Sequence, residues 1–473
     1  MTTAITQWVT RARTITAVGA LAGALALPAP PARAFPGTTE RVSVDSAGNQ
    51  ANGPCLSGAF APPPSITPDG RFVAFAAWAR NLAPGDTNGF GDVFVHDRRT
   101  SITERVSVDG AGNEANDTIH QPAISADGHF VVFVSAATNL VPGDSNGRDD
   151  VFVHDRLTRT TERVSVDSAG NQADGESSSP AISADGRFVA FVSFATNLVP
   201  GDSNGRGDVF VRDRLTETTE RVSVDSAGNE ANRGSDGPSI SANGRFVVFW
   251  SDATNLVRGD TNGVADVFVH DRLTRTTERV SVDSAGNEGN GASGLHSHSE
   301  YSISADGRFV TFVSNATNLV RGDTNGAADV FVHDRLTRAT ERVSVDSAGN
   351  QGNDGSFSPA VSANGRFVAF VSFATNLAAG DSNSSFVSGV FVHDRHTGTT
   401  ELVSVDSGGG NLANGSSQHP SISATGGFVA FVSFATNLVP GDTNEQPDVF
   451  VRDRKTAEDS DTTWHQRRRP RRR

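Results

Sequence analysis

The chain has 473 residues, a formal net charge of −14 and a single cysteine, Cys55. One cysteine excludes an internal disulfide, so an exported form of this protein must be held by core packing or bound ions. The acidic balance argues against nucleic acid and anionic lipid as main partners, and it suits the binding of cations.

The first segment of the chain has the features of a secretion signal. Arg11 and Arg13 precede an apolar run, and Ala34 ends a small-residue cleavage site. A membrane anchor is the alternative, but the apolar run is short, rich in Ala and Gly, and followed by prolines. We therefore expect residues 1–34 to be a signal peptide and the protein to be exported, as a secreted, periplasmic or cell-envelope protein.

After this segment, a unit of 58 residues is repeated seven times with small insertions. A fixed period of this length with strand-like content is typical of a β-propeller, with one blade per repeat. Each copy carries the marker Asp-Ser/Thr-Asn, which starts at Asp86, Asp144, Asp202, Asp260, Asp323, Asp381 and Asp442.

The third copy predicts four antiparallel strands. A short inner strand at 180–183 turns through Asp-Gly, which supplies the positive φ angles of tight turns, into a second strand at 187–193. The second strand is apolar on both faces, as expected between neighbouring blades. A long loop leads to a third strand at 208–213, and a fourth at 219–225 alternates apolar and polar residues, which places it at the rim.

Phenylalanine is concentrated in the second and third strands. Of the 29 Phe residues, 14 lie in the Phe-Val-x-Phe second strands and seven more lie in the third strands. We predict that these rings form the core of the blades rather than a stacking surface for a ligand.

The two ends of the repeat array complement each other. Residues 39–45 have the sequence of an outer strand without a blade, whereas the last copy has no outer strand after 448–453. Pairing them would close the ring and remove its exposed sheet edges. The prediction is an all-β fold over residues 35–454: a seven-bladed β-propeller with four antiparallel strands per blade, whose N-terminal strand closes the last blade. The Arg-rich residues 455–473 are expected to form a disordered basic tail.

The repeat resembles a known family. Ser-Ala-Asp-Gly-Arg-Phe-Val-Ala-Phe is similar to the Ser-Pro-Asp-Gly-Lys-x-Ile-Ala-Phe unit of TolB-type, WD-repeat-like bacterial propellers, and residues 67–72 give the most similar copy. The resemblance covers all seven repeats, but no TolB-like N-terminal α/β domain precedes them. It implies an extracytoplasmic, protein-binding propeller, and the family offers no catalytic residues to transfer.

The loop between the second and third strands has the pattern Asp-Ser/Thr-Asn-Gly-x-x-Asp. Oxygen ligands at positions 1, 3 and 7 around a Gly turn resemble the first half of a calcium loop. Asp and Asn also cap turns through their own backbone, so turn chemistry alone is the alternative. The sixth copy lacks the Gly and the final Asp, so it should be empty if calcium binds. The candidate calcium ligands are Asp86, Asn88, Asp92, Asp144, Asn146, Asp150, Asp202, Asn204, Asp208, Asp260, Asn262, Asp266, Asp323, Asn325, Asp329, Asp442, Asn444 and Asp448.

Two apparent catalytic motifs are repeated, which argues against catalysis. The third strands carry His-Asp-Arg in five copies, with Arg212 and Arg452 in place of His in the other two. A catalytic pair would occur once, so we predict a packing and hydrogen-bonding role. Gly-x-Ser-x-Gly occurs in two acidic loops, but it lacks the strand-to-helix turn of a hydrolase nucleophile.

The copies differ most in the connections between blades, which should cluster at the mouth of the central channel. Three of the polar residues there could form a transition-metal site, with a solvated loop as the alternative: His296, His298 and Glu300. The candidate ligand-binding residues at the mouth are His120, His296, His298, Glu300, Tyr301 and His419.

These features predict a monomeric binding scaffold for a protein or an extracellular polymer, with calcium as a possible stabilising ion. The alternative is a propeller enzyme, a hydrolase or lyase acting on an extracellular polymer or lactone at the channel mouth. Catalysis would require several of the mouth residues to converge on one point, whereas their dispersal would favour binding. A purely structural envelope protein is a third possibility.

Overall fold

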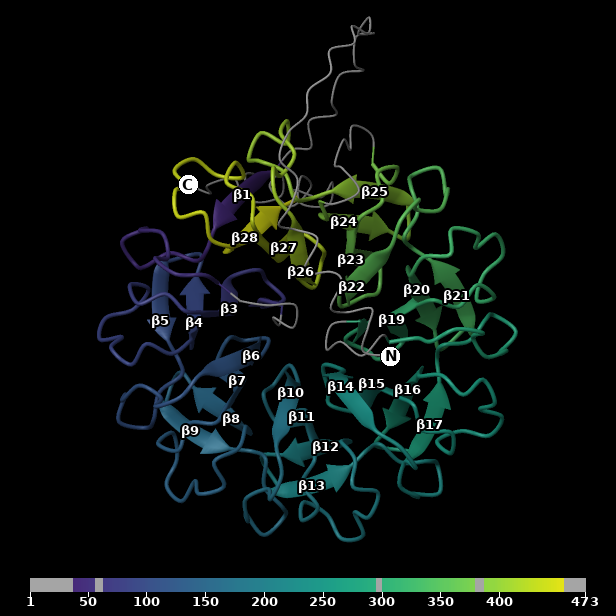
Figure 1. The fold of residues 1–473 in the computed structure, drawn as a ribbon, viewed down its shortest axis with the longest axis horizontal. Coiled ribbons are helices and arrows are strands. Elements are labelled where there is room, and N and C mark those ends of the chain that lie inside the picture. The colour runs from purple at the N-terminus through teal and green to yellow at the C-terminus, as the bar shows by residue number, and fades with distance from the viewer. Residues whose placement is uncertain (1–36, 56–62, 295–299, 379–386, 455–473) are drawn as a thin grey trace, which may run out of the picture. The chain divides into compact units, whose positions relative to one another are not determined.

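A computed structural model of the chain describes residues 37–55, 63–294, 300–378 and 387–454. The strands form seven four-stranded antiparallel sheets arranged as blades around a central axis (Figure 1). The predicted seven-bladed β-propeller is therefore confirmed. The expected signal peptide and basic tail lie outside the described residues. Within the described part, no helix has the length and hydrophobicity needed to cross a bilayer.

Blades 1 to 7 are numbered in the order of their inner strands. The inner strands are β2 (Ser65–Ile66), β6 (Ile119–Ile124), β10 (Ser177–Ile182), β14 (Ser235–Ile240), β18 (Tyr301–Ile303), β22 (Ser356–Val361) and β26 (Ser417–Ile422). The second strands are β3 (Phe72–Ala77), β7 (Phe130–Ser135), β11 (Phe188–Ser193), β15 (Phe246–Ser251), β19 (Phe309–Ser314), β23 (Phe367–Ser372) and β27 (Phe428–Ser433). The third strands are β4 (Asp92–Asp97), β8 (Asp150–Asp155), β12 (Asp208–Asp213), β16 (Asp266–Asp271), β20 (Asp329–Asp334), β24 (Gly389–Asp394) and β28 (Asp448–Asp453). The outer strands are β5 (Ile102–Arg105), β9 (Thr160–Arg163), β13 (Thr218–Arg221), β17 (Thr276–Arg279), β21 (Ala339–Arg342), β25 (Thr399–Leu402) and, for blade 7, β1 (Thr38–Arg41).

In five blades the inner strand starts earlier than predicted, whereas β2 and β18 start at or after the position equivalent to Pro180. In blade 3 the expected strand began at Pro180, but β10 begins at Ser177 and its register against β11 shifts between Ser178 and Ala181. Pro180 has no N–H to donate, and Ser179 adopts a left-handed φ of 54°. The chain therefore passes the proline as a β-bulge and continues the strand.

The core of each blade is a pair of phenylalanines on adjacent strands. In blade 3, Phe191 of β11 and Phe210 of β12 are fully buried, and their ring centroids lie 5.9 Å apart. The equivalent pairs in the other blades are separated by 5.7 to 6.0 Å. The prediction that phenylalanine rings build the core is confirmed for these pairs. The first Phe of six second strands is only partly buried and packs against this core: Phe72, Phe130, Phe188, Phe246, Phe309 and Phe428.

A repeated arginine clamp joins each blade to the preceding one. In blade 3, Arg214 donates to the carbonyl of Gly186 at 2.5 Å, pairs with Glu162 of blade 2 at 2.5 Å, and lies 4.3 Å above the ring of Phe130 in blade 2. Gly186 has a φ of +71°, and a Cβ atom there would collide with the Phe130 ring, so this close approach requires glycine. The seven arginine–glutamate pairs are Arg98–Glu40, Arg156–Glu104, Arg214–Glu162, Arg272–Glu220, Arg335–Glu278, Arg395–Glu341 and Arg454–Glu401.

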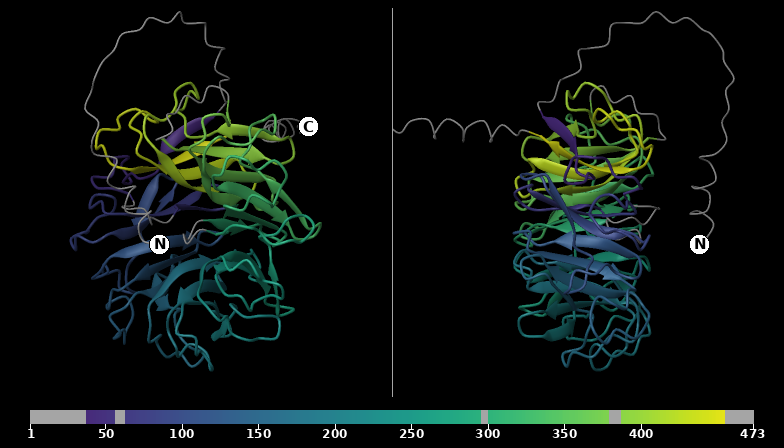
Figure 2. Two further views of the ribbon diagram at one scale, coloured as in Figure 1. Left: turned by 45° about the vertical axis from the view of Figure 1, so that its right-hand side comes forward. Right: turned by 90° about the vertical axis from the view of Figure 1, so that its left-hand side faces the viewer.

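The N-terminal strand closes the ring as predicted. Strand β1 pairs with β28 over four residues, from Thr38 with Asp453 to Arg41 with Phe450. Figure 2 shows β1 beside the last strands from two further directions. Thr39 also donates to the carbonyl of Val405 in blade 6 at 2.6 Å, as the equivalent threonine does in every other blade. Blade 7 therefore has the same interfaces as the others, although its outer strand comes from the other end of the chain.

Candidate functional site

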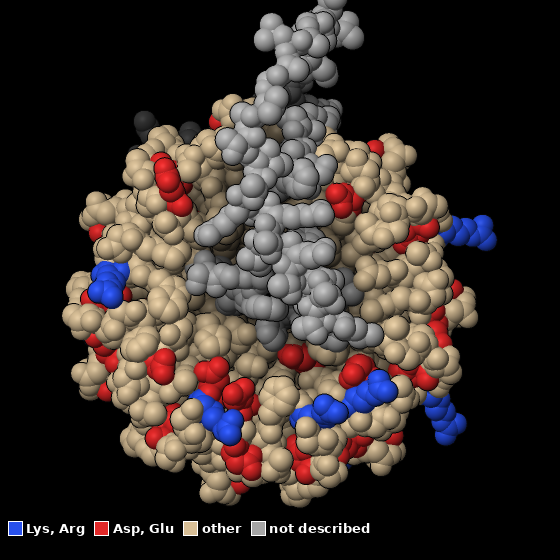
Figure 3. All heavy atoms as spheres, in the orientation of Figure 1, with Lys and Arg blue, Asp and Glu red and all other residues tan. Residues whose placement is uncertain are grey.

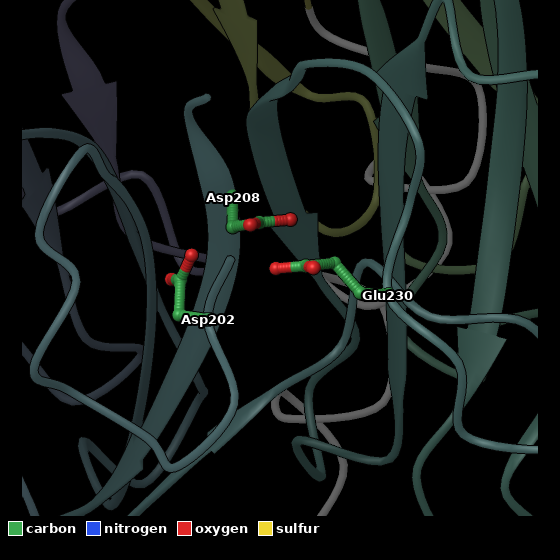
Figure 4. A group of neighbouring side chains, drawn as sticks. All are labelled: Asp202, Asp208 and Glu230. Atoms are coloured by element: carbon green, nitrogen blue, oxygen red, sulfur yellow. The ribbon is translucent and has the colours of Figure 1, made fainter. Parts of the chain in front are cut away.

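In six of the seven blades, all except blade 6, the acidic loop folds over an arginine of the outer strand. In blade 3, Asp208 at the start of β12 is fully buried, and its Oδ1 accepts a hydrogen bond from Ser223 Oγ at 2.5 Å. Arg221 Nη1 lies 3.5 Å from Asp208 Oδ2 and 3.6 Å from Asp202 Oδ2, and it also pairs with Glu230. Figure 4 shows the carboxylates of Asp202, Asp208 and Glu230 facing one another.

The asparagine of the six loops that the structure describes in full serves the turn. In blade 3, Asn204 Oδ1 accepts a hydrogen bond from the backbone N–H of Arg206 at 2.7 Å, and its Nδ2 donates to the carbonyl of Ala231 at 3.0 Å. The same backbone bond is made by Asn88, Asn146, Asn262, Asn325 and Asn444. The turn chemistry weighed as the alternative is thus present at the asparagines, whereas the acids of the loop face one another.

Two members of this cluster were not predicted from the sequence. One is the outer-strand arginine, and the other is a residue after the outer strand that closes the cluster from the opposite side. That residue is glutamate in blades 1, 3 and 4 (Glu114, Glu230 and Glu288), glutamine in blades 2, 5 and 7 (Gln172, Gln351 and Gln50), and Leu412 in blade 6. In blade 6 the arginine is replaced by Leu402 and the final aspartate by Gly389. This joint loss is visible in the sequence, and it could have identified the arginine as a partner of the acids.

Glutamine and glutamate leave the cluster in different states. In blade 5, Gln351 Nε2 donates to Asp323 Oδ1 at 3.0 Å and to Asp329 Oδ2 at 2.9 Å. In blade 3, Glu230 instead accepts hydrogen bonds from the N–H and Oγ of Ser203 at 3.0 and 2.8 Å. As a result, a buried oxygen of the marker aspartate has no hydrogen-bond donor among the described residues in any of the three glutamate blades: Asp86 Oδ1, Asp202 Oδ2 and Asp260 Oδ1.

The electrostatics of blade 3 reflect this difference. Burial, followed by the charges of Asp208 and Glu230, raises the pKa of Asp202 to about 6 against the pull of Arg221. Burial also raises the pKa of Asp208. For Glu230 burial acts in the same direction, but hydrogen bonds from Ser203 and the charge of Arg221 outweigh it and lower its pKa. One ligand atom from each of the three acids lies within 4.8 Å of the other two, so this cluster could hold a metal ion.

The central channel is lined by the inner strands and has a volume of about 270 Å³. Six blades contribute a proline and blade 5 contributes Tyr301: Pro64, Pro122, Pro180, Pro238, Tyr301, Pro359 and Pro420. Serine and alanine follow these residues, and no charged side chain lines the channel within the described part of the chain. Acidic side chains instead lie around the channel on the face seen in Figure 3.

The described mouth residues come from three separate blades. His120 lies in β6 of blade 2, with its Nε2 3.8 Å from Asp149 Oδ2. Tyr301 in blade 5 is buried and donates to the carbonyl of Asp236 at 2.8 Å, and the preceding Glu300 is buried as well. His419 in blade 7 has a buried Nδ1 without a hydrogen-bond partner in the described residues, and burial lowers its pKa to about 4. His296 and His298 lie outside the described residues.

Several of these positions belong to strands rather than to connections. His120 and His419 were expected in connections between blades, but they lie in β6 and β26. The reason is again the β-bulge before the proline, which allows the inner strand to extend to the channel mouth.

The repeated His-Asp-Arg motif has a structural role, as predicted. In blade 4, His270 Nδ1 lies 2.9 Å from Thr277 Oγ1, and burial lowers the pKa of His270. Asp271 accepts two hydrogen bonds from Arg245 at 2.8 and 2.6 Å. Where arginine replaces histidine in blade 3, Arg212 Nη1 donates to the equivalent Thr219 Oγ1 at 3.2 Å.

Comparison with known proteins supports the fold of the chain but assigns the chain to no family. No family model and no curated protein matches the chain. Among solved structures, it is similar to the oligogalacturonate lyase of Vibrio parahaemolyticus, with 13% identity over 89% of this chain and 98% of that one and a TM-score of 0.50. An oligogalacturonate lyase in complex with manganese gives 12% identity over 89% and 97% of the two chains and a TM-score of 0.51. The shared feature is the β-propeller fold.

TolB proteins are also among the similar structures. The TolB of Acinetobacter baumannii has 16% identity over 66% of this chain, with a TM-score of 0.37, and the chain spans 58% of that protein's length.

Proposed function

We propose that this protein is an exported β-propeller that binds a protein or an extracellular polymer at the mouth of its central channel. The observation that carries the proposal is the placement of the polar mouth residues. His120, Glu300 and His419 belong to blades 2, 5 and 7, no two of which are neighbours in the ring. The Glu300 side chain is buried, whereas that of His120 is more than a third exposed, so His120 is the one that a ligand covering the mouth would contact directly.

The alternative, a polymer-cleaving or lactone-cleaving propeller, receives less support from the same placement. General acid–base catalysis needs groups within about 3 Å of one reacting centre. The described wall of the channel consists of proline, serine, alanine, Gln121 and Tyr301, without a carboxylate or an imidazole, and the Tyr301 hydroxyl already donates to the carbonyl of Asp236. If a retained ligand is a polymer, measuring its chain length after incubation separates the two functions, since only an enzyme shortens it.

A retention experiment tests the binding proposal. The purified protein is immobilised and exposed to the secreted and envelope fractions of its native source, beside two mouth variants, His120→Ala and Glu300→Gln. The control is His396→Ala, an exposed residue in the turn between β24 and β25, at the opposite end of the strands. We expect a ligand that wild type and H396A retain and a mouth variant loses. Equal retention by all four proteins would contradict binding at the mouth.

Export and calcium are further parts of the proposal. N-terminal sequencing of protein recovered outside the cytoplasm should begin at residue 35, and an intact N-terminus would contradict cleavage after Ala34. Calcium in the acidic loops should raise the melting temperature, because an ion that binds only the folded state stabilises it. Identical melting with calcium and with a chelator, together with no calcium by elemental analysis, would contradict a calcium-stabilised ring.

A further inference from the structure

We infer that the acidic cluster of blade 3, formed by Asp202, Asp208 and Glu230, binds a divalent cation of the calcium type. The inference rests on the calcium part of the proposed function. It restricts the expected calcium sites from six acidic loops to the blades that have a glutamate in the cluster. It does not depend on what binds at the channel mouth.

The first observation is the net charge of the blade 3 cluster. Three carboxylates meet the single guanidinium of Arg221, so the fully ionised cluster keeps two negative charges. The side chains of Asp202 and Asp208 are only 3% and 0% exposed, so water cannot solvate their charges. Buried charge without compensation is costly, and one divalent cation would make the cluster neutral.

The second argument is the unsatisfied oxygen of Asp202. Its Oδ2 is buried and accepts no hydrogen bond from the residues described, and Arg221 Nη1 lies 3.6 Å away. The equivalent Asp323 Oδ1 in blade 5 receives the amide of Gln351 at 3.0 Å. In blade 5 an amide N–H of Gln351 bridges the two aspartates. In blade 3 only Asp208 receives an amide, from Asn204 Nδ2 at 2.9 Å, and Asp202 Oδ2 faces the Arg221 guanidinium without a hydrogen bond. An ionised oxygen directed into the cluster and left without a donor is suited to ligate a cation.

The ligand chemistry selects the kind of cation. The cluster offers three carboxylates and no nitrogen or sulfur ligand, which suits calcium and other hard cations better than zinc or copper. Water would complete the six to eight oxygen ligands that calcium takes. Blades 1 and 4 have the same acids and the same unsatisfied oxygen, on Asp86 and Asp260. In blade 1 Arg80 adds a positive charge near Asp86, so we expect weaker binding there.

Calorimetric titration with calcium chloride at pH 7.5 tests the inference on the purified protein and the variant Glu230→Gln. Glutamine occupies this position in three other blades, so the change is compatible with the fold. The matched control is Glu220→Gln, in the same blade, whose carboxylate pairs with Arg272 and takes no part in the cluster. We expect E230Q to bind one calcium fewer than wild type, and E220Q to bind the same number.

Two results would overturn the inference and have different consequences. Equal calcium uptake by wild type and E230Q would place the ion elsewhere and leave the calcium part of the proposed function standing. No uptake by wild type at millimolar calcium would remove both. Should E230Q fail to fold, the reverse change Gln351→Glu decides: a gain of one calcium in blade 5 supports the inference, and no gain overturns it.

Discussion

Blades 3 and 6 have the same arrangement of four strands, but the side chains at three equivalent positions are charged in blade 3 and apolar or absent in blade 6. Blade 3 places Asp208, Arg221 and Glu230 there, whereas blade 6 has Gly389, Leu402 and Leu412. The pairing of the strands is unchanged: Asp208 faces Ser193, and Gly389 faces Ser372. In blade 6, Leu402 joins the apolar core, with Leu412 packed against it. A blade can therefore form without the acidic cluster.

The difference between blades 3 and 6 distinguishes contacts that every blade needs, which we call the frame, from the acidic cluster, which a blade can lack. The frame consists of the phenylalanine pairs, the arginine clamps and the threonine bonds between outer strands, and all seven blades have it. The acidic cluster is present in six blades and varies between glutamate and glutamine. Removing a whole strand of the frame should therefore destabilise the protein most, and the effect of changes to the cluster should depend on charge, pH and calcium.

Deleting residues 37–45 breaks the frame at the ring closure and should have the largest effect. It removes β1, the fully buried Val42 and the bond from Thr39 to blade 6, and it exposes the edge of β28. We expect a loss of more than about 5 kcal/mol, enough to abolish cooperative unfolding in a domain of ordinary stability. Circular dichroism during heating measures this loss, and a peptide of residues 37–52 should restore the transition. Normal melting of the deleted protein would contradict closure by β1.

Arg221→Leu gives blade 3 the leucine that blade 6 has at this position, but it keeps the three acids. The change leaves three acids without their counter-charge, so we expect a loss of about 3–5 kcal/mol in calcium-free buffer. The combined variant D208G/R221L/E230L copies the side chains of blade 6 and should lose less than R221L alone, because two of the stranded charges are gone. Urea denaturation at pH 7.5 gives both values. A combined variant that is less stable than R221L would show that blade 6 depends on something other than this exchange.

Asp202→Asn tests whether the unsatisfied carboxylate of a blade with glutamate in its cluster destabilises the fold. Because the pKa of Asp202 is raised to about 6, the folded protein holds a proton between pH 4 and 6 that the unfolded chain releases. The stability contributed by this group therefore falls as pH rises through that window, and the loss persists above it. Asparagine cannot ionise, so D202N should match wild type near pH 4 and exceed it at pH 8 in the absence of calcium. A shift of this size corresponds to about 3 kcal/mol, which we reduce to about 1–2 for screening by solvent.

Asp323→Asn in blade 5 is the control for this prediction. Asp323 accepts the amide of Gln351, and an asparagine there gives up a good acceptor. D323N should therefore bring no stabilisation at pH 8, as measured by urea denaturation across the pH range. Destabilisation by D202N at pH 8 without calcium would contradict the unsatisfied charge in blade 3.

Glu220→Ala should have the smallest effect. Its carboxylate is about half exposed and pairs with Arg272 at the rim, where water screens the charge. We expect a loss below about 0.5 kcal/mol. Arg272→Ala should cost more, because Arg272 also donates to the carbonyl of Gly244 and lies over the ring of Phe188. Equal losses for the two variants in thermal melts would mean that the ion pair alone makes the clamp.

The fold could be predicted from the sequence because its signals are local and repeated. The third strand of blade 3 was placed at 208–213 by its own apolar run, and the closure followed from the unpaired residues 39–45. The contacts between Arg214 and Glu162 could not be predicted, since they depend on how two blades are stacked. The unsatisfied oxygen of Asp202 was also hidden, because it depends on which way Glu230 turns. Only Leu402 in the sixth copy indicated the arginine's role.

The most direct test of the account is a crystal structure grown with manganese in place of calcium, with anomalous difference maps that locate the ion. We expect an anomalous peak among the carboxylates of Asp202, Asp208 and Glu230, and none in blade 5, where Gln351 bridges the two aspartates. No peak in blade 3, or peaks of equal height in blades 3 and 5, would contradict it.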